Sequence, residues 1–310
     1  MKEQGVASLL QETPSLAEFS AEFLKFVEDD HNIEADTRRF YKHGWTMLSR
    51  TKLASMKMDA ITESDCRTAE FAGGNYTANQ AIRTLRRMFT IAKDKNKFHG
   101  DLPKIETRKV WGRKTAMSTQ QADLIASKMK AGSDPKDLLL IMRATGMRPK
   151  ELYRARWEHV NWSTGHYVNP NGKTATAQRP VPLLDEAGTI LKRRWLAAGT
   201  PQSGWVFPSA DAKCGHIVSI AKAFRKARIA TGLPQNLCLY TARHGVGTEL
   251  GAVLSLKEVM DILGHSDSRT ALGYQHPSTA NVQSRLNEAR AAGLRLDAEL
   301  EQGRIAERIN

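Results

Sequence analysis

The strongest constraint on the fold is the spacing of apolar residues in the first hundred positions, where they recur every three or four residues. Ser15 can cap a helix, and Leu16, Phe19 and Phe23 follow it at this spacing. The same period predicts three further helices: one over 35–50, a short one after Thr62, and one from Thr77 onward. No convincing strand pattern interrupts them. We therefore predict a small helical domain over residues 15–100.

Length and charge bound what such a domain can belong to. The chain has 310 residues, which at about 100–200 residues per domain corresponds to roughly two domains. Its 46 Lys and Arg residues outnumber 33 Asp and Glu residues. A basic surplus of this size favours a polyanionic partner, most often nucleic acid. No apolar run approaches the ~18 residues of a membrane span, and the charged N-terminus lacks the apolar stretch of a signal peptide.

Cysteine and histidine usage excludes several classes of site. The three cysteines, Cys66, Cys214 and Cys238, are too few and too scattered for a disulfide framework. No Cys-x-x-Cys or His-Glu-x-x-His spacing suggests zinc. We expect a reduced, cytoplasmic protein with no metal, no cofactor and no membrane partner.

The most basic segment lies between the two expected domains. Residues 82–114 hold eleven Lys and Arg against three Asp and Glu. A lone basic run is usually a solvated helix face with a flexible connector. At a domain junction it can instead lie along a phosphate backbone, and we interpret residues 101–117 as a basic linker. The candidate DNA-binding residues are Arg83, Arg86, Arg87, Lys93, Lys95, Lys97, Lys104, Arg108, Lys109, Arg113 and Lys114.

The second half of the chain mixes helices with a small sheet. Helices are expected near 118–130, 134–144, 184–198, 217–231, 241–252, 256–263 and 268–274, and a strand over His166–Val168 faces another that leads into Arg179–Leu183. This predicts a mainly α protein with a small antiparallel β-sheet. We divide it into an arm (1–14), the helical domain (15–100), the linker (101–117), a second domain (118–277) and a helical tail (278–310). An apolar stripe along the tail must be buried against something.

Two short stretches place arginines at helix starts. Gly146 can end one helix and Pro149 can begin the next, so Arg148 would lie at a helix N-terminus, where anions are favoured. Glu151, one turn later, can hold its guanidinium. Arg243 begins another helix and precedes several small residues, which suggests close packing. Taken alone, Arg148 is as readily structural as functional, whereas a lone arginine in the place of Arg243 is more often structural.

Three other residues complete a possible constellation. His265 follows the end of an expected helix, and Tyr274 lies nine positions later. Lys173 lies in an expected hairpin turn. The Gly172-Lys173-Thr174 sequence is not a phosphate-binding P-loop, because Tyr167 stands where that motif needs glycine and the context is strand–turn–strand.

In this order, these residues resemble the tyrosine recombinase (phage integrase) family: Arg-x-x-Glu after Thr-Gly, a hairpin lysine, Arg-His, Leu-Gly-His, and a tyrosine nine residues on. The resemblance covers about Leu16 to Tyr274 and is strongest over 144–157, 239–249 and 259–274. One position departs from it, since Tyr240 stands where the family usually has histidine, three residues before Arg243. Tyrosine can donate a hydrogen bond but cannot shuttle protons near neutral pH.

The resemblance implies a fold, a reaction and a set of roles. The fold would be a helical core-binding domain plus an α+β catalytic domain. The reaction would be site-specific cutting and rejoining of DNA through a 3′-phosphotyrosine, without metal or ATP, for integration or excision. The implied catalytic residues are Tyr274 as nucleophile, Arg148 and Arg243 on the phosphate, Lys173 as acid, His265, Tyr240 and, in support, Glu151; His244 would pack behind Arg243.

The resemblance also implies partners and leaves rivals. Partners would be double-stranded DNA, three further copies through the tail on two recombining sites, and accessory DNA-bending proteins, in a bacterial cytoplasm at the nucleoid. The tail can alternatively fold back on its own domain. Other functions kept open are a catalytically impaired DNA-binding or regulatory protein, a chromosome-dimer resolvase, and a type IB topoisomerase-like enzyme.

Overall fold

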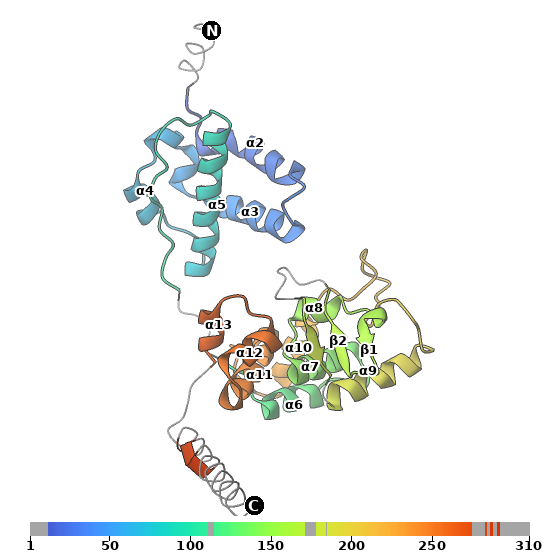
Figure 1. Ribbon diagram of the computed structural model, residues 1–310. Coiled ribbons are helices and arrows are strands. Elements are labelled where there is room, and N and C mark those ends of the chain that lie inside the picture. Colours follow the sequence, from blue (N-terminus) through green and yellow to red (C-terminus); the bar gives the residue numbers. More distant parts are fainter. Residues whose placement is uncertain are drawn as a thin grey trace, which may run out of the picture. The chain divides into compact units, whose positions relative to one another are not determined.

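The computed structural model describes residues 12–110, 115–170, 178–183 and 185–274, together with single positions between 283 and 291. The chain divides into two compact units, residues 1–113 and 114–310 (Figure 1). It is mainly helical with one small antiparallel sheet, which confirms the predicted fold class. In the part of the chain that the structure describes, no helix is both long and apolar enough to cross a membrane.

The first unit is built from helices and short 3-10 turns. These are α2 (Leu16–Asp29), α3 (Ala35–Leu48), η1 (Lys52–Ser55), η2 (Met58–Ala60), α4 (Glu63–Thr68) and α5 (Asn75–Asp94). Ser15 and Thr62 each form a capping box with the carboxylate three residues later, which satisfies backbone N–H groups at the starts of α2 and α4. The predicted helices are all present, and α5 begins two residues before Thr77.

A single apolar core joins α2, α3 and α5. Phe19, Phe23, Leu85 and Phe89 are almost fully buried within it. Helices α3 and α5 approach closely at Gly44, where an added Cβ would lie 1.9 Å from the Thr84 hydroxyl oxygen. A larger residue at position 44 would therefore push these helices apart.

Much of the predicted linker is attached to this first unit. The Asn79 side chain donates to the Arg108 carbonyl at 2.8 Å and accepts from the Arg108 N–H at 2.6 Å. Ile105 is buried, and the Arg108 guanidinium lies over the Phe71 ring. Apolar burial and a buried amide partner thus hold residues 105–108 against α5. The sequence did not predict this attachment, because the basic residues around Ile105 gave no signal of its burial.

The second unit contains eight helices among its described residues. They are α6 (Thr119–Ser127), α7 (Asp134–Thr145), α8 (Pro149–Tyr153), α9 (Asp185–Ala197), α10 (Ala221–Ala230), α11 (Leu239–Val253), α12 (Leu256–Leu263) and α13 (Ser268–Leu272). Helix α7 lies at the centre and packs against α6, α8, α9 and α11. Its predicted apolar run explains this position, since Leu138, Leu139 and Ile141 are fully buried.

The sheet has the order β1-β2-β3, with both pairs antiparallel. Strand β2 (His166–Val168) pairs with β3 (Pro180–Pro182), as predicted, with Tyr167 opposite Val181. The sequence did not predict β1 (Val160–Asn161), which follows the 3-10 turn η3 (Trp157–His159) and places Asn161 opposite His166. A two-residue strand is too short to show a period, and its Asn161 resembles the turn that follows.

Three apolar clusters support the second unit, and the helix ends between them carry charged residues. One cluster surrounds α7 and the sheet, a second joins α6 and α10, and a third joins α11, α12 and Tyr274. Of the tail stripe only Leu286 lies within the described residues, and it is half exposed. The other apolar positions of that stripe, and Lys173, lie outside the described residues.

Candidate active site

The turn between α7 and α8 holds the first arginine. Gly146 ends α7 with φ of 65°, a left-handed conformation that suits glycine, and an added Cβ would lie 2.7 Å from Leu263. Arg148 caps α8 and donates from Nη1 to Glu151 Oε1 at 2.6 Å and from Nη2 to the Gly264 carbonyl at 3.0 Å. About a third of its side chain, 32%, remains exposed. The guanidinium is thus fixed in direction but still open to a ligand.

Arg243 is the most deeply buried charged residue of the site, with no exposed surface. It projects from the first turns of α11 and donates from Nη1 to the Gly146 carbonyl at 2.6 Å and from Nη2 to the Leu263 carbonyl. Burial, aided by the nearby Arg148 charge, lowers its pKa to about 10. The guanidinium therefore stays charged at neutral pH, held by the ends of α7 and α12.

His265 follows the left-handed Gly264 that ends α12. Its Nε2 lies 2.9 Å from Arg243 Nη2. Burial, together with the charges of Arg243 and Arg148, lowers the pKa of His265 to about 4, so its ring is neutral at pH 7. Since a guanidinium only donates, Nε2 accepts and Nδ1 carries the proton. Within the described residues this buried Nδ1, like Arg243 Nε, has no hydrogen-bond partner.

Glu151 and Arg179 form a buried ion pair next to Arg148 and Arg243. Arg179 donates from Nε to the Ile262 carbonyl at 2.6 Å and lies 3.5 Å from Glu151 Oε2. Burial raises the pKa of Glu151, but Arg179 and the Arg148 hydrogen bonds outweigh it, so the pKa lies below its usual value. Burial lowers the pKa of Arg179, with Glu151 opposing. Sequence reasoning missed Arg179, since a charged residue before a strand gives no signal of its burial.

Tyr274 lies against one face of α11 and is only 5% exposed. An added Cβ at Gly247 would lie 2.9 Å from the Tyr274 ring, and one at Gly251 would lie 2.6 Å from the Tyr274 carbonyl oxygen. The absence of side chains at these two positions therefore allows Tyr274 to pack against α11. The Tyr274 ring stacks on the His265 ring with centroids 5.8 Å apart. Burial raises the pKa of the phenol above its usual value, although Arg243 and Arg148 oppose the rise.

The Tyr274 hydroxyl lies 2.9 Å from His244 Nδ1. The expectation that His244 packs behind Arg243 is therefore wrong: its ring faces Tyr274 and the edge of Tyr240, with ring centroids 4.9 Å apart in the latter pair. Positions 240, 244, 247 and 251 follow a four-three-four spacing, which is one helix face. That spacing was the available signal, and it separates His244 from Arg243 on the neighbouring face.

The structure brings Arg148, Glu151, Arg243, His265 and Tyr274 together. Tyr240 is 42% exposed and meets this group through His244. Lys173 lies outside the described residues.

Several of the predicted DNA-binding residues make hydrogen bonds or ion pairs within the first unit. Arg86 donates to the Ile105 carbonyl, Arg108 to the Ala69 carbonyl, and Lys93 to the Gly100 carbonyl at 3.4 Å. Ion pairs join Lys95 to Glu22 and Lys104 to Glu106. Arg83, Lys97 and Lys109 are at least partly exposed, Arg87 lies near Phe26, and Arg113 and Lys114 lie outside the described residues. Arg86 and Arg108 therefore also tie the segment after α5 to the first unit.

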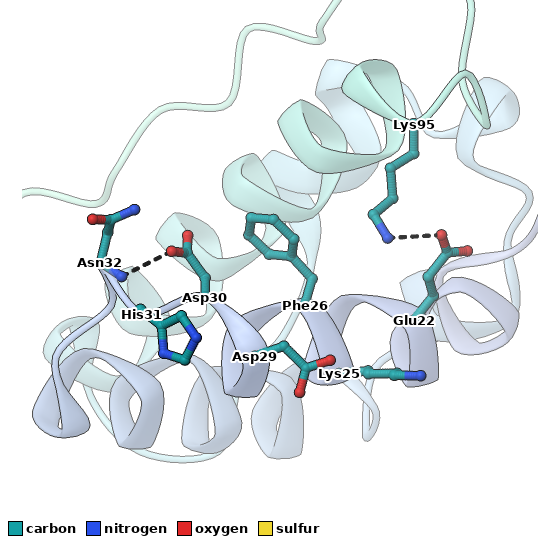
Figure 2. A pocket seen from close by; sticks show the side chains of 8 residues that line it. All are labelled: Glu22, Lys25, Phe26, Asp29, Asp30, His31, Asn32 and Lys95. Carbon is teal, nitrogen blue, oxygen red and sulfur yellow. Dashed lines mark hydrogen bonds and ion pairs between the residues drawn. The ribbon is translucent and has the colours of Figure 1, made fainter.

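A surface pocket of about 630 Å³ lies elsewhere, on α2 of the first unit (Figure 2). Phe26 is among the residues that line it, and Lys95 bridges to Glu22 at 3.0 Å. Carboxylates of Asp29 and Asp30 face the same space as its lysines. Mixed charge of this kind builds neither an anion nor a cation site, and the pocket contains none of the predicted catalytic residues. Among the residues that the structure describes, no cluster of His, Cys, Asp and Glu can hold a metal ion.

Comparison with known proteins gives one family. Residues 116–281 match the model of the Phage integrase family. The chain is 27% identical over 291 residues to tyrosine recombinase XerD of Staphylococcus saprophyticus, covering 86% of this chain and 96% of that protein. It is 26% identical over 255 residues to the putative integrase/recombinase y4rF of Sinorhizobium fredii, covering 76% of this chain and 59% of the other.

Solved structures share the fold at low sequence identity. A lambda integrase dimer bound to a COC′ core site matches with a TM-score of 0.67 and 18% identity over 89% of this chain and 81% of that one. The Tn1549 transposon integrase in complex with transposon right end DNA matches with a TM-score of 0.65 and 18% identity, over 89% and 99% of the two chains. These likenesses extend over both units of the present chain.

Proposed function

We propose, since this chain belongs to the phage integrase family of tyrosine recombinases, that it cuts and rejoins DNA strands through a 3′-phosphotyrosine on Tyr274. The protein is a tyrosine-type site-specific DNA recombinase. In the proposed reaction the Tyr274 oxygen attacks the scissile phosphorus and the 5′-oxygen leaves. Because the phosphodiester energy is kept in the enzyme–DNA bond, a second 5′-hydroxyl can restore the strand without ATP.

The observation that carries this proposal is the pair of unpartnered donors beside the tyrosine. Arg243 Nε and His265 Nδ1 are buried and, among the described residues, unpaired. Buried donors are nearly always paired in native proteins, and exceptions are often found where a substrate atom completes them. A phosphate offers several acceptor oxygens to such donors. The arrangement therefore supports a phosphate ligand next to Tyr274.

Two fixed guanidiniums would supply the charge that this transition state needs. Arg148 is partly exposed and donates to the Gly264 carbonyl after α12, whereas Arg243 is buried and donates to carbonyls at the ends of α7 and α12. Donors that are already oriented need no rearrangement as charge grows on the non-bridging oxygens, and one such donor is typically worth about 2.7–4 kcal/mol. The proposed chemistry therefore runs without a metal. Glu151 supports it by holding Arg148 on both its backbone N–H and its guanidinium.

The remaining roles rest on the family resemblance. Lys173 is assigned to protonate the leaving 5′-oxygen. His265 donates to a phosphate oxygen from Nδ1, which fits its lowered pKa, since the neutral ring carries a single proton there. Tyr240, with its exposed ring, donates a hydrogen bond to phosphate from its hydroxyl but does not transfer that proton.

The proposed substrate is double-stranded DNA, bound mainly through phosphates by the basic residues of the first unit and of the segment after it. Solved relatives of the same fold are described as a dimer on a core site and a tetramer on a Holliday junction. We propose a tetramer on two sites, joined through the C-terminal tail, in integration or excision of a mobile element. We propose in addition that accessory DNA-bending proteins assist the tetramer, and that the protein acts on the nucleoid in a bacterial cytoplasm.

A second candidate is a DNA-binding protein that has lost catalysis. Two observations favour it: tyrosine replaces the usual histidine at position 240, and the Tyr274 hydroxyl is bonded to His244 and almost fully buried. Both candidates predict DNA binding. Only the recombinase predicts a covalent intermediate.

The test is a suicide-substrate trap using nicked duplexes drawn from the DNA that flanks the gene. The wild-type protein should form a denaturation-resistant protein–DNA adduct. Tyr274→Phe should form none while binding the same duplexes with unchanged affinity. An adduct formed by Tyr274→Phe would show that the nucleophile is another residue. Binding without any adduct from the wild type would favour the second candidate.

A further inference from the structure

We propose that His244 is the base that takes the proton from Tyr274 when the tyrosine attacks phosphorus. This inference rests on the proposed function and adds a catalytic residue to it. The contact that carries it is direct: His244 Nδ1 lies 2.9 Å from the Tyr274 hydroxyl oxygen, within the range required of a general base. In the tautomer with its proton on Nε2, Nδ1 accepts from the phenol.

The surroundings keep this contact in one arrangement. Tyr240, one turn before His244, presses against its ring at an interplanar angle of 76°. Gly247 and Gly251 lie on the same face of α11, where Tyr274 packs against them. A side chain at either position would clash with Tyr274. Tyr240 thus orients the imidazole while the glycines orient the phenol, so the two polar atoms meet.

The other candidates for the proton are poorly suited. His265 stacks face to face on the Tyr274 ring at an interplanar angle of 18°, so its nitrogens do not point at the hydroxyl. Its Nε2 is already occupied by Arg243. Tyr240 carries a neutral phenol, which is too weak a base to accept the proton of another phenol. Arg148 and Arg243 are cations with no acceptor atom.

The protonation states agree with this assignment. Burial and the Arg243 charge lower the pKa of His244 below its usual value, so at pH 7 the ring is neutral and able to accept. Burial raises the pKa of Tyr274, so the phenol keeps its proton until a base removes it. The titratable groups in contact with His244 are Tyr240 on α11 and Tyr274 after α13, and the Arg243 guanidinium and the His265 ring are near enough to interact with it electrostatically.

The proposed step forms one bond to phosphorus, breaks another and moves one proton to His244. A lone pair of the Tyr274 oxygen forms the new bond to phosphorus, and the phenol proton passes to His244 Nδ1. The bond from phosphorus to the 5′-oxygen breaks with both electrons going to that oxygen, which receives its proton from the separate acid assigned above. On rejoining, the 5′-hydroxyl gives its proton back to the deprotonated form of that same acid and its oxygen attacks phosphorus. The bond from phosphorus to the Tyr274 oxygen breaks with both electrons going to that oxygen, which receives its proton from His244.

The experiment compares His244→Ala, His244→Gln and the wild type in single-turnover cleavage of a suicide substrate across pH. Both variants should bind DNA normally and cleave at least about 100-fold more slowly at pH 7, the usual effect of removing a general base. The wild-type rate should fall on acidification as His244 becomes protonated, and this acid limb should be absent from both variants. Added imidazole should restore cleavage to His244→Ala by at least about tenfold. His166→Gln, a histidine of β2, serves as the control and should cleave like the wild type.

A second substrate separates a base from an acid. With sulfur in place of the 5′-leaving oxygen, the leaving group needs no proton, so a defect in the base persists and a defect in the acid disappears. Both His244 variants should remain slow on this substrate. Rescue by sulfur, a His244→Gln rate within about threefold of the wild type, or an acid limb that survives in the variants would each overturn the assignment. A wild type that forms no adduct on either substrate overturns the proposed function and this role together.

Discussion

The two units bury different kinds of residue. Among the described residues, the first unit has one apolar core, and the polar side chains buried in it are the uncharged Asn79 and Thr84. The second unit divides its apolar residues among three clusters and buries several charged or titratable side chains, of which Glu151, Arg243 and His265 belong to the site. The interior of the first unit is therefore almost entirely apolar, whereas the interior of the second unit also holds charged side chains in fixed orientations.

The difference lies in how a buried charge is tolerated. Burying an ion without partners is far more costly than burying an amide or hydroxyl. Arg243 is accommodated because carbonyls at the ends of α7 and α12 accept from it, at the positions where helices leave carbonyls unpaired. Helix ends thus hold the guanidiniums, and the helix interiors between them supply the apolar clusters. The same comparison predicts distinct responses to mutation and to pH.

The largest effect is expected in the first unit, from Phe89→Ala. Phe89 is 1% exposed and packs edge to face with Phe98 at 5.2 Å between centroids. Its truncation should lower the free energy of unfolding of the first unit by about 3–5 kcal/mol, the usual cost of removing a buried phenyl ring. Hydrogen exchange followed by mass spectrometry reports each unit separately and should show faster exchange in α2, α3 and α5.

The matched control is Arg83→Ala, at an exposed position of the same helix. It should change the stability of the first unit by less than about 0.5 kcal/mol. Equal exchange rates in Phe89→Ala and the control would mean that the first unit does not depend on its apolar core in the way proposed.

A smaller effect should appear in the second unit on acidification. The folded-state pKa of His265 is about 4, below its ordinary value of about 6.5 in the unfolded chain. Between these values the unfolded chain binds more protons, so stability is complete above about pH 6.5 and is lost as the pH falls toward 4. The second unit should lose on the order of 2 kcal/mol between pH 7 and pH 5. Denaturant unfolding at several pH values measures this loss.

His265→Gln isolates the contribution of His265 to the pH dependence of stability, because glutamine can still accept a hydrogen bond from Arg243 but does not titrate. Its stability should vary less with pH over the same interval, and the remaining slope would come from His244, whose pKa is also lowered. A variant as sensitive to pH as the wild type would place the titrating groups elsewhere in the second unit.

The same contrast explains what the sequence could predict. Helices of the first unit follow from apolar period and from capping residues such as Ser15 and Thr62, which act over three or four positions. The motif residues Arg148, Arg243, His265 and Tyr274 were found because their types and order are unusual, and not because local physics brings them together. Their convergence depends on contacts across more than a hundred positions, such as that of Arg148 with Gly264.

The missed features share one cause. Arg179 pairs with Glu151 across 28 positions, and His244 meets Tyr274 across 30. Neither distance is visible to a local pattern, and a charged residue beside a strand or after an arginine is usually solvated. Ile105 was hidden in the same way, since the basic residues around it suggested a solvated linker. Buried polar partners are thus the part of this fold that local sequence patterns predict least.

The smallest effect, and the sharpest probe of the second unit, is expected from Tyr240→Phe. The phenyl ring keeps the edge contact that orients His244, and the change removes only a hydroxyl. A hydrogen bond to a charged group contributes about 1.5–3 kcal/mol, and the exposed Tyr240 hydroxyl, which competes with water, should lie at the lower end of that range. Single-turnover cleavage should therefore fall by about tenfold. Tyr240→Ala should fall further, because it also releases the imidazole from its contact. If Phe and Ala slow cleavage equally, the hydroxyl matters and the ring does not. In that case the second unit would orient His244 without the aromatic contact, and the exposed phenol at position 240 would itself act on the phosphate.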